Sequence, residues 1–180
     1  MTVQMTTLSN GLRVISEGRE GLQTTAVGVW VDAGARYETT ANNGVAHMLE
    51  HMAFKGTESR SAQDIAVEIE SVGGHLNAYT SREHTAYFVR VMKEDLGLSV
   101  DILGDILQRS TFAEEEMARE RTVVIQEIGQ SEDTPDDIIF DRLQEASFPG
   151  QALGRSILGP VDGVANMGRE VLFDFMGQHY

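Results

Sequence analysis

The segment His47-Met48-Leu49-Glu50-His51 constrains the fold more than any other part of this chain. Histidines four residues apart lie on the same face of an α-helix, where both imidazoles can bind one metal ion. Neutral imidazole is a good zinc ligand. Glu50 is three residues from His47, so its carboxylate can reach a water on that ion and accept its proton. This inverted order, His-x-x-Glu-His, is a known metallopeptidase signature. We therefore expect a helix over residues 43–54 that carries two zinc ligands, His47 and His51, and a general base, Glu50.

The same segment has two simpler explanations. Met48, Leu49 and Met52 are apolar, so it could be an ordinary buried helix whose histidines only form hydrogen bonds. That explanation gives no reason for an ionisable Glu50 among apolar neighbours. A structural zinc site is the second explanation, but such sites favour cysteine thiolates and the chain contains no cysteine. We therefore favour a catalytic site.

Length and charge limit the classes of function. At 180 residues, 41% of them hydrophobic, the chain can form one domain with a sizeable core. Its net charge of −14 argues against nucleic-acid binding, which needs a basic surface, and is compatible with a basic peptide ligand. No stretch approaches the roughly 18 apolar residues that span a bilayer, so we expect no membrane partner.

The expected compartment follows from features that the sequence lacks. Residues 1–5 show no basic region followed by an apolar run, and no Arg/Ser-rich amphipathic leader follows them. The absence of cysteine fits a reducing compartment. We therefore expect a cytoplasmic protein of bacterial origin.

The pattern of apolar residues predicts an α+β fold. Strands, rich in β-branched residues and bounded by turn signals, are expected over residues 12–15, 24–31, 75–80 and 84–92. Helices are expected over residues 43–54, 61–72, 93–108, 113–131, 135–146 and 168–178. In the second helix Ser61 suits the N-cap, and Ile65, Val67 and Ile69 provide an apolar side. Strands and helices cluster rather than alternate, which favours a mostly antiparallel sheet with helices packed on it.

A catalytic zinc ion needs a third protein ligand and an open position. The candidates are His75, His84, His179 or a carboxylate. Glu120 and Glu127 are seven residues apart, on nearly the same face of one predicted helix. The apolar run 123–125 is expected to pack inward, which places Glu127 beside the core, although a solvated surface glutamate is the alternative explanation. The residues by themselves leave this choice open.

Three blocks of the chain resemble one peptidase family. They are residues 47–57 (His-Met-Leu-Glu-His-Met-Ala-Phe-Lys-Gly-Thr), residues 73–80 (Gly-Gly-His-Leu-Asn-Ala-Tyr-Thr) with 83–85, and residues 120–128 (Glu-Arg-Thr-Val-Val-Ile-Gln-Glu-Ile). The first block resembles the active-site segment of the pitrilysin/insulinase family, in its mitochondrial-processing-peptidase branch. The resemblance covers nearly all of the chain, in order and with family-like spacing.

The resemblance implies roles for five of these residues. His47, His51 and Glu127 are expected to bind one zinc ion, with Glu50 as the general base. Glu120 matches a glutamate that supports the site without binding the metal, and such partners orient the ligands. The implied activity is zinc-dependent hydrolysis of peptide bonds.

The resemblance also implies where substrate lies. In the family an extended peptide adds to an edge strand, which places Asn77, Ala78 and Tyr79 near the cleft. For Tyr79, an ordinary strand position is an equally good explanation. Asp137 and Asp141 share one helix face and match acidic residues that help recognise a substrate arginine, a contact that suits a carboxylate pair. A solvated acidic face is the alternative for that pair.

Length is the departure from the family, because full members carry two homologous halves in one chain or on partner subunits. We therefore expect residues 1–180 to be an incomplete amino-terminal catalytic domain that works with a second half or a partner subunit. The expected function is a zinc metalloendopeptidase acting on extended, basic peptides. The alternative is a non-catalytic structural or substrate-presenting subunit of the same fold, although such relatives usually have eroded motifs.

Overall fold

An antiparallel three-stranded sheet forms the centre of the structure, a computed structural model that describes residues 3–180. The strand order is β3-β5-β4, with β3 (Thr24–Val31) and β4 (His75–Thr80) each paired to the central β5 (Thr85–Met92). In this register Trp30, Ala86 and Tyr79 lie side by side across the sheet. Strand β4 therefore pairs on one side only and is an edge strand of this sheet.

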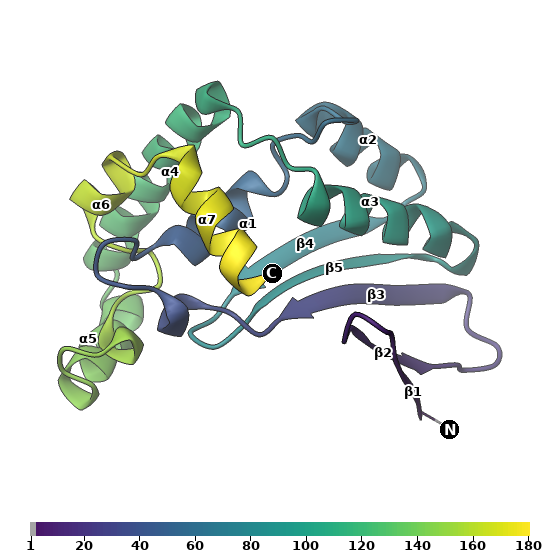
Figure 1. The fold of residues 1–180 in the computed structure, drawn as a ribbon, viewed down its shortest axis with the longest axis horizontal. Coiled ribbons are helices and arrows are strands. Elements are labelled where there is room, and N and C mark those ends of the chain that lie inside the picture. Colours follow the sequence, from purple (N-terminus) through teal and green to yellow (C-terminus); the bar gives the residue numbers. More distant parts are fainter. Residues whose placement is uncertain (1–2) are drawn as a thin grey trace.

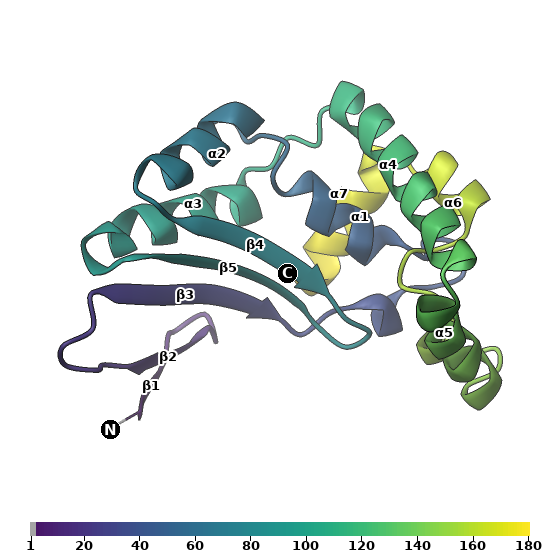
Figure 2. The ribbon, with the colours of Figure 1, turned by 180° about the vertical axis from the view of Figure 1, so that it is seen from behind.

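Helices cover one face of the sheet and extend past one end of it. The helices are α1 (Val45–Met52), α2 (Ala62–Ser71), α3 (Leu96–Gln108), α4 (Glu114–Asp133), α5 (Pro135–Ser147), α6 (Val161–Ala165) and α7 (Arg169–His179). Figures 1 and 2 show α2 and α3 above the strands, while α4, α5 and α6 lie beyond the end of the sheet. Among residues 3–180 no helix covers the opposite face, where Trp30 and Tyr79 are exposed.

A separate hairpin precedes the sheet. Strands β1 (Val3–Thr7) and β2 (Arg13–Glu17) pair only with each other, and all of their residues are exposed. The hairpin lies beside β3 in both views (Figures 1 and 2). Its apolar side chains, such as Met5 and Ile15, therefore contribute to no core within residues 3–180.

Two apolar clusters hold the layers together. One joins α1 to α4 and α7, through residues that include Met48, Val124 and Phe175. The other joins the covered face of the sheet to α2 and α3, through residues that include Ile69 and Val89. Helix α1 therefore lies between the sheet and helices α4 and α7, and it contacts β4 as well as both of these helices.

The expected α+β class and antiparallel sheet are confirmed. Ser61 caps α2 as predicted, accepting a hydrogen bond from the backbone N–H of Asp64 while the Asp64 carboxylate accepts one from Ser61 N–H. Two expected positions are wrong: Val67 was expected on the apolar side of α2 and Val123 was expected to pack inward, but both side chains are exposed. Buried positions follow the three- and four-residue spacing of a helix, which excludes these two.

Strand β1 and helix α6 were not expected. Strand β1 is polar at alternate positions and is held only by its partner β2, so its own sequence gives a weak strand signal. Helix α6 has five residues, fewer than a hydrophobic period needs to be recognised.

Candidate metal centre and active site

A buried acidic residue that precedes helix α1 in the sequence caps the start of this helix. Its N-cap residue, Gly44, has a φ of 95° and no side chain to cap the free N–H groups. The Glu38 carboxylate replaces that cap, accepting hydrogen bonds from the N–H groups of Gly44 and Ala46, both at 2.9 Å, and from Asn43 Nδ2 at 2.7 Å. Burial raises the pKa of Glu38, although these donors oppose that shift. The start of α1 is thus fixed by a buried carboxylate.

The two sides of α1 have different chemistry. Its buried side consists of apolar residues: Val45, Ala46, Met48, Leu49 and Met52. His47, Glu50 and His51 are only partly buried and lie together on the remaining side. Because the apolar side is locked in the core, the three polar side chains leave the helix in a fixed direction.

His47, His51 and Glu127 converge. Each offers one ligand atom, and these atoms lie within 4.8 Å of one another; no other such group occurs among residues 3–180. Glu127 Oε2 is 3.7 Å from His47 Nε2 and 3.5 Å from His51 Nε2. Two ligands at tetrahedral positions around zinc are about 3.4 Å apart, given bonds of about 2.1 Å. The donor set and its spacing therefore fit a zinc ion.

The histidines are held differently. Burial, together with the neighbouring imidazole of His51, lowers the pKa of His47 to about 4, so His47 is neutral at pH 7, the form that binds metals. His51 Nδ1 lies 3.0 Å from Glu120 Oε2. Burial by itself raises the pKa of Glu120, but hydrogen bonds from Lys55 and then His51 bring it below its usual value. Glu120 thus supports His51 as a charged carboxylate.

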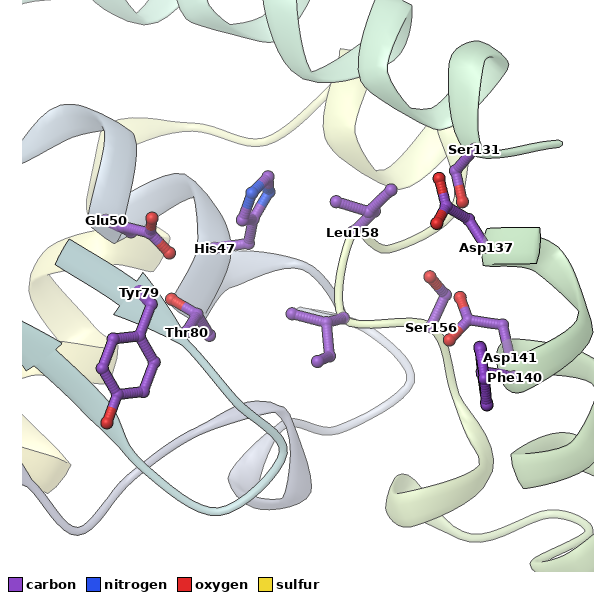
Figure 3. Close-up of a pocket in the computed structure, with 11 residues that line it drawn as sticks. His47, Glu50, Tyr79, Thr80, Ser131, Asp137, Phe140, Asp141, Ser156 and Leu158 are labelled. Carbon is purple, nitrogen blue, oxygen red and sulfur yellow. The ribbon is translucent and has the colours of Figure 1, made fainter. Parts of the chain in front are cut away.

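A cavity of about 410 Å³ opens beside the cluster. It is lined by His47, Glu50, Tyr79, Thr80, Ser131, Asp137, Phe140, Asp141, Ser156, Ile157 and Leu158. Figure 3 shows His47, Glu50, Tyr79 and Thr80 on one side and the α5 residues Asp137, Phe140 and Asp141 on the other. A ligand in this cavity would contact both the face of α1 that carries His47 and Glu50 and the α5 side chains Asp137, Phe140 and Asp141.

The three β4 residues proposed to contact substrate occupy different positions. Tyr79 borders the cavity, but its ring points away from His47 and Glu50 (Figure 3), and its hydroxyl lies 3.3 Å from Trp30 Nε1 and 3.1 Å from His84 Nε2. Asn77 is exposed on the uncovered face of the sheet, and Ala78 is buried on the other face. Of the three, Tyr79 alone borders the cavity described above.

The two acidic residues of α5 both line the cavity but differ in their partners. Asp141 Oδ1 accepts a hydrogen bond from Arg82 Nη2 at 2.8 Å, and Arg82 Nε donates to the Leu153 carbonyl at 3.1 Å. Asp137 has no ion pair among residues 3–180. Asp137 is therefore the carboxylate of the two that remains open to a cation.

The other histidines lie away from the cluster. His84 contacts Tyr79, and His179 packs against Phe175 with ring centroids 4.5 Å apart and the rings tilted by 49°. His75 is exposed near the start of β4. The structure thus brings Glu127, and none of these three, to His47 and His51.

Four residues with a part in this site were not singled out from the sequence: Glu38, Lys55, Arg82 and Phe140. Lys55 offered a signal, since it is four residues after His51 and hence near the same face. Glu38, Arg82 and Phe140 offered none, because their contacts depend on tertiary structure.

Known proteins resemble this chain along most of its length. A family model described as "Insulinase (Peptidase family M16)" matches residues 13–161. The chain belongs to this family. Family M16 is the pitrilysin/insulinase family to which the motif blocks pointed, so that resemblance is confirmed.

Curated relatives of this M16 chain include subunits of one peptidase. The mitochondrial-processing peptidase subunit beta of Mus musculus is 50% identical over 98% of this chain and 36% of its own length. The subunit of the same name from Dictyostelium discoideum is 49% identical over 98% of this chain and 38% of its own length. The chain thus spans little more than a third of these relatives.

A solved structure shares the fold of this M16 chain. It is described as the crystal structure of a protease from Helicobacter pylori, with a TM-score of 0.92 and 27% identity, and the match covers 97% of this chain and 42% of that one. The agreement confirms the α+β architecture over nearly the whole chain.

The expected cytoplasmic, bacterial origin is contradicted. The similar curated proteins are mitochondrial-processing peptidase subunits of eukaryotes. The expectation relied on a missing leader and missing cysteines, and neither property identifies a compartment. Across residues 3–180, each helix is too short or too polar to cross a bilayer.

Proposed function

We propose that residues 1–180 form the amino-terminal catalytic domain of a zinc-dependent metalloendopeptidase. The observation that carries the proposal is the convergence of His47, His51 and Glu127, with ligand atoms within 4.8 Å of one another, beside a cavity that Glu50 also lines. Membership of peptidase family M16 supports it.

Each side chain has a chemical task in this proposal. His47, His51 and Glu127 hold the ion, and Glu120 orients His51 through its Nδ1. A zinc ion supplies Lewis-acid polarisation and lowers the pKa of water. Glu50 accepts a proton from the attacking water and passes it to the leaving amine, so that one carboxylate serves as base and then as acid.

The proposed substrate is an extended peptide with basic residues. The edge of β4 offers unpaired backbone groups to such a peptide, beside Asn77 and Tyr79. Asp137, which has no ion pair within the described part of the chain, offers the carboxylate for a basic side chain. Asp141, already bound to Arg82, holds the wall of the cavity in place.

The proposed enzyme acts together with a second homologous half or a partner subunit. The chain spans little more than a third of its curated relatives, and those relatives are named as subunits.

The decisive experiment compares wild type with Glu50→Gln in the complete protein and its partner. The substitution removes the base without changing the proposed ligands, so we expect about one zinc ion per chain in both proteins. Cleavage of an unstructured basic peptide should fall by at least about 100-fold, the scale of general-base catalysis. A chelator should abolish the wild-type activity.

A matched control is Glu132→Gln, an exposed glutamate on α4. It should leave both zinc content and cleavage unchanged. Wild-type turnover in Glu50→Gln would contradict the assigned base. Wild type that binds zinc but cleaves no peptide would instead favour a non-catalytic subunit of the same fold.

A further inference from the structure

The side chain of Lys55 reaches the buried carboxylate behind the metal cluster. Lys55 follows α1, where its N–H donates to the Met52 carbonyl at 3.1 Å. Its Nζ lies 2.7 Å from Glu120 Oε1. The Lys55 side chain is 31% exposed and that of Glu120 only 7%, so the ammonium group approaches from the solvent side. Among residues 3–180, the side chains of Lys55 and His51 are the only ion-pair partners of Glu120, and Lys55 is the one that carries a permanent positive charge.

The two oxygens of Glu120 are divided between two partners. Oε1 is held by Lys55 Nζ, and Oε2 lies 3.0 Å from His51 Nδ1. A carboxylate bound at one oxygen by an ammonium group cannot rotate freely, so the second oxygen stays at the imidazole. An Nδ1–H that donates to it leaves the Nε2 lone pair free. Nε2 is the atom that lies 3.5 Å from Glu127 Oε2.

The surroundings of Glu120 show why a cation is needed there. Glu120 lies on the buried stripe of α4, between Met117 and Val124, both fully buried. A carboxylate oxygen left without a partner at such a position is costly, and the side chain would turn to satisfy it. Lys55 provides the partner for Oε1 while Glu120 keeps the orientation in which Oε2 contacts His51.

Building on the proposed zinc site, we infer that Lys55 is a positioning residue of the metal centre. By holding one oxygen of Glu120, it keeps the other on His51 Nδ1 and so aims His51 Nε2 at the ion. The effect is specific to one ligand: His47 Nδ1 is buried and has no hydrogen-bond partner among residues 3–180. Removing Lys55 should therefore disturb His51 and leave His47 as it is.

The test uses four variants of the complete protein. Lys55→Met keeps the length of the side chain and removes its charge, whereas Lys55→Arg restores a cation. Lys93→Met is the matched control, because Lys93 is the other lysine of the sequence and is exposed at the end of β5. Lys55→Leu, which also removes the donor to Glu120, takes the place of Lys55→Met if that variant does not fold.

Two quantities are measured. The first is the Kd for zinc, by competition with a chromogenic chelator, and we expect Lys55→Met to weaken binding by about 10- to 100-fold, as loss of a ligand's supporting partner does. The second is the imidazole tautomer in the metal-free protein, from ¹⁵N chemical shifts of labelled histidines. We expect Lys55→Met to shift His51 from the Nδ1–H form towards a mixture, with His47 unchanged. Lys55→Arg should recover most of both values, and Lys93→Met should match wild type.

The outcomes separate this inference from the function on which it rests. Wild-type zinc affinity and an unchanged His51 tautomer in Lys55→Met or Lys55→Leu would overturn the inference, even with a lower melting temperature, because a purely structural ion pair affects stability alone. Wild type that binds no zinc would overturn the proposed function and the inference with it.

Discussion

Glu127 is the least restrained of the three converging side chains. The histidine side chains are 12% and 17% exposed, whereas that of Glu127 is 39% exposed. Beyond the two imidazoles, the described part of the chain gives Glu127 no ion-pair partner. Its place beside them therefore depends on α4 packing against α1, and not on contacts of its own.

Substituting Glu127 should separate metal binding from stability. For Glu127→Ala we expect zinc affinity to fall by more than about 100-fold, beyond the loss caused by a supporting partner. The free energy of unfolding of the metal-free protein should change by less than about 0.5 kcal/mol, as for other partly exposed positions. Chelator competition and urea titration give the two values. Glu132→Ala, also on α4 but exposed, should change neither. Retention of wild-type affinity in Glu127→Ala would remove Glu127 from the ligand set.

Helix α1 depends on its buried cap, the Glu38 carboxylate. Burial raises the pKa of Glu38 above its value of 4.5 in the unfolded chain. The folded protein therefore holds this proton more tightly than the unfolded chain, so the contribution of Glu38 to stability is present below about pH 4.5 and lost as the pH rises through the folded pKa. Glutamine does not titrate. We expect the free energy of unfolding of Glu38→Gln, minus that of wild type, to increase between pH 4 and pH 7 in urea titrations of the metal-free protein. A difference that is flat or falls with pH would show that Glu38 is not buried as described.

Helix α5 depends on one ion pair. None of its residues is buried, and the Arg82 contacts with Asp141 and the Leu153 carbonyl tie it to the β4–β5 turn. For Arg82→Met we expect a loss of about 1 kcal/mol of stability and faster amide exchange in α5. Hydrogen exchange followed by mass spectrometry measures the second effect. Arg142→Met removes an exposed pair on the same helix, with Glu145, and should leave α5 exchange unchanged. Equal exchange in the two variants would refute this role of Arg82.

Local signals and long-range contacts explain which features could be predicted. His47, Glu50 and His51 fall within five consecutive residues, so their spacing alone predicts both the helix and the side of it that is polar. Glu127 could be proposed only as one of several candidates, because its approach to α1 results from packing between helices distant in sequence. The Arg82–Asp141 pair, and hence the different state of Asp137, is decided by where α5 lies beside the β4–β5 turn. No property of the acidic helix face indicates that contact.

Several large apolar side chains are exposed on the hairpin and on the sheet. Met5 and Ile15 are directly paired across the β1–β2 hairpin, and each is about two-thirds exposed. Trp30 is similarly exposed on the uncovered face of the sheet. Surfaces of this kind are usually covered by further protein.

We therefore expect residues 1–180 alone to self-associate as their concentration rises. The double variant Met5→Thr/Ile15→Thr places threonine, a β-branched residue that suits a strand, at both positions. It removes the apolar pair, so it should associate less. Sedimentation velocity over a range of concentrations compares the two. A wild-type chain that stays monomeric throughout would contradict the expectation.

The proposed ligands come from two helices, α1 and α4, that are separated in the sequence by α2, the β4–β5 hairpin and α3. An ion shared by them would act as a cross-link that closes a long loop of chain and that forms only in the native state. Zinc would then bind the folded protein and not the unfolded one, so its free concentration would set part of the folding equilibrium. A cell could thereby adjust how much of this protein is folded, as well as how much is active, through the zinc that it supplies.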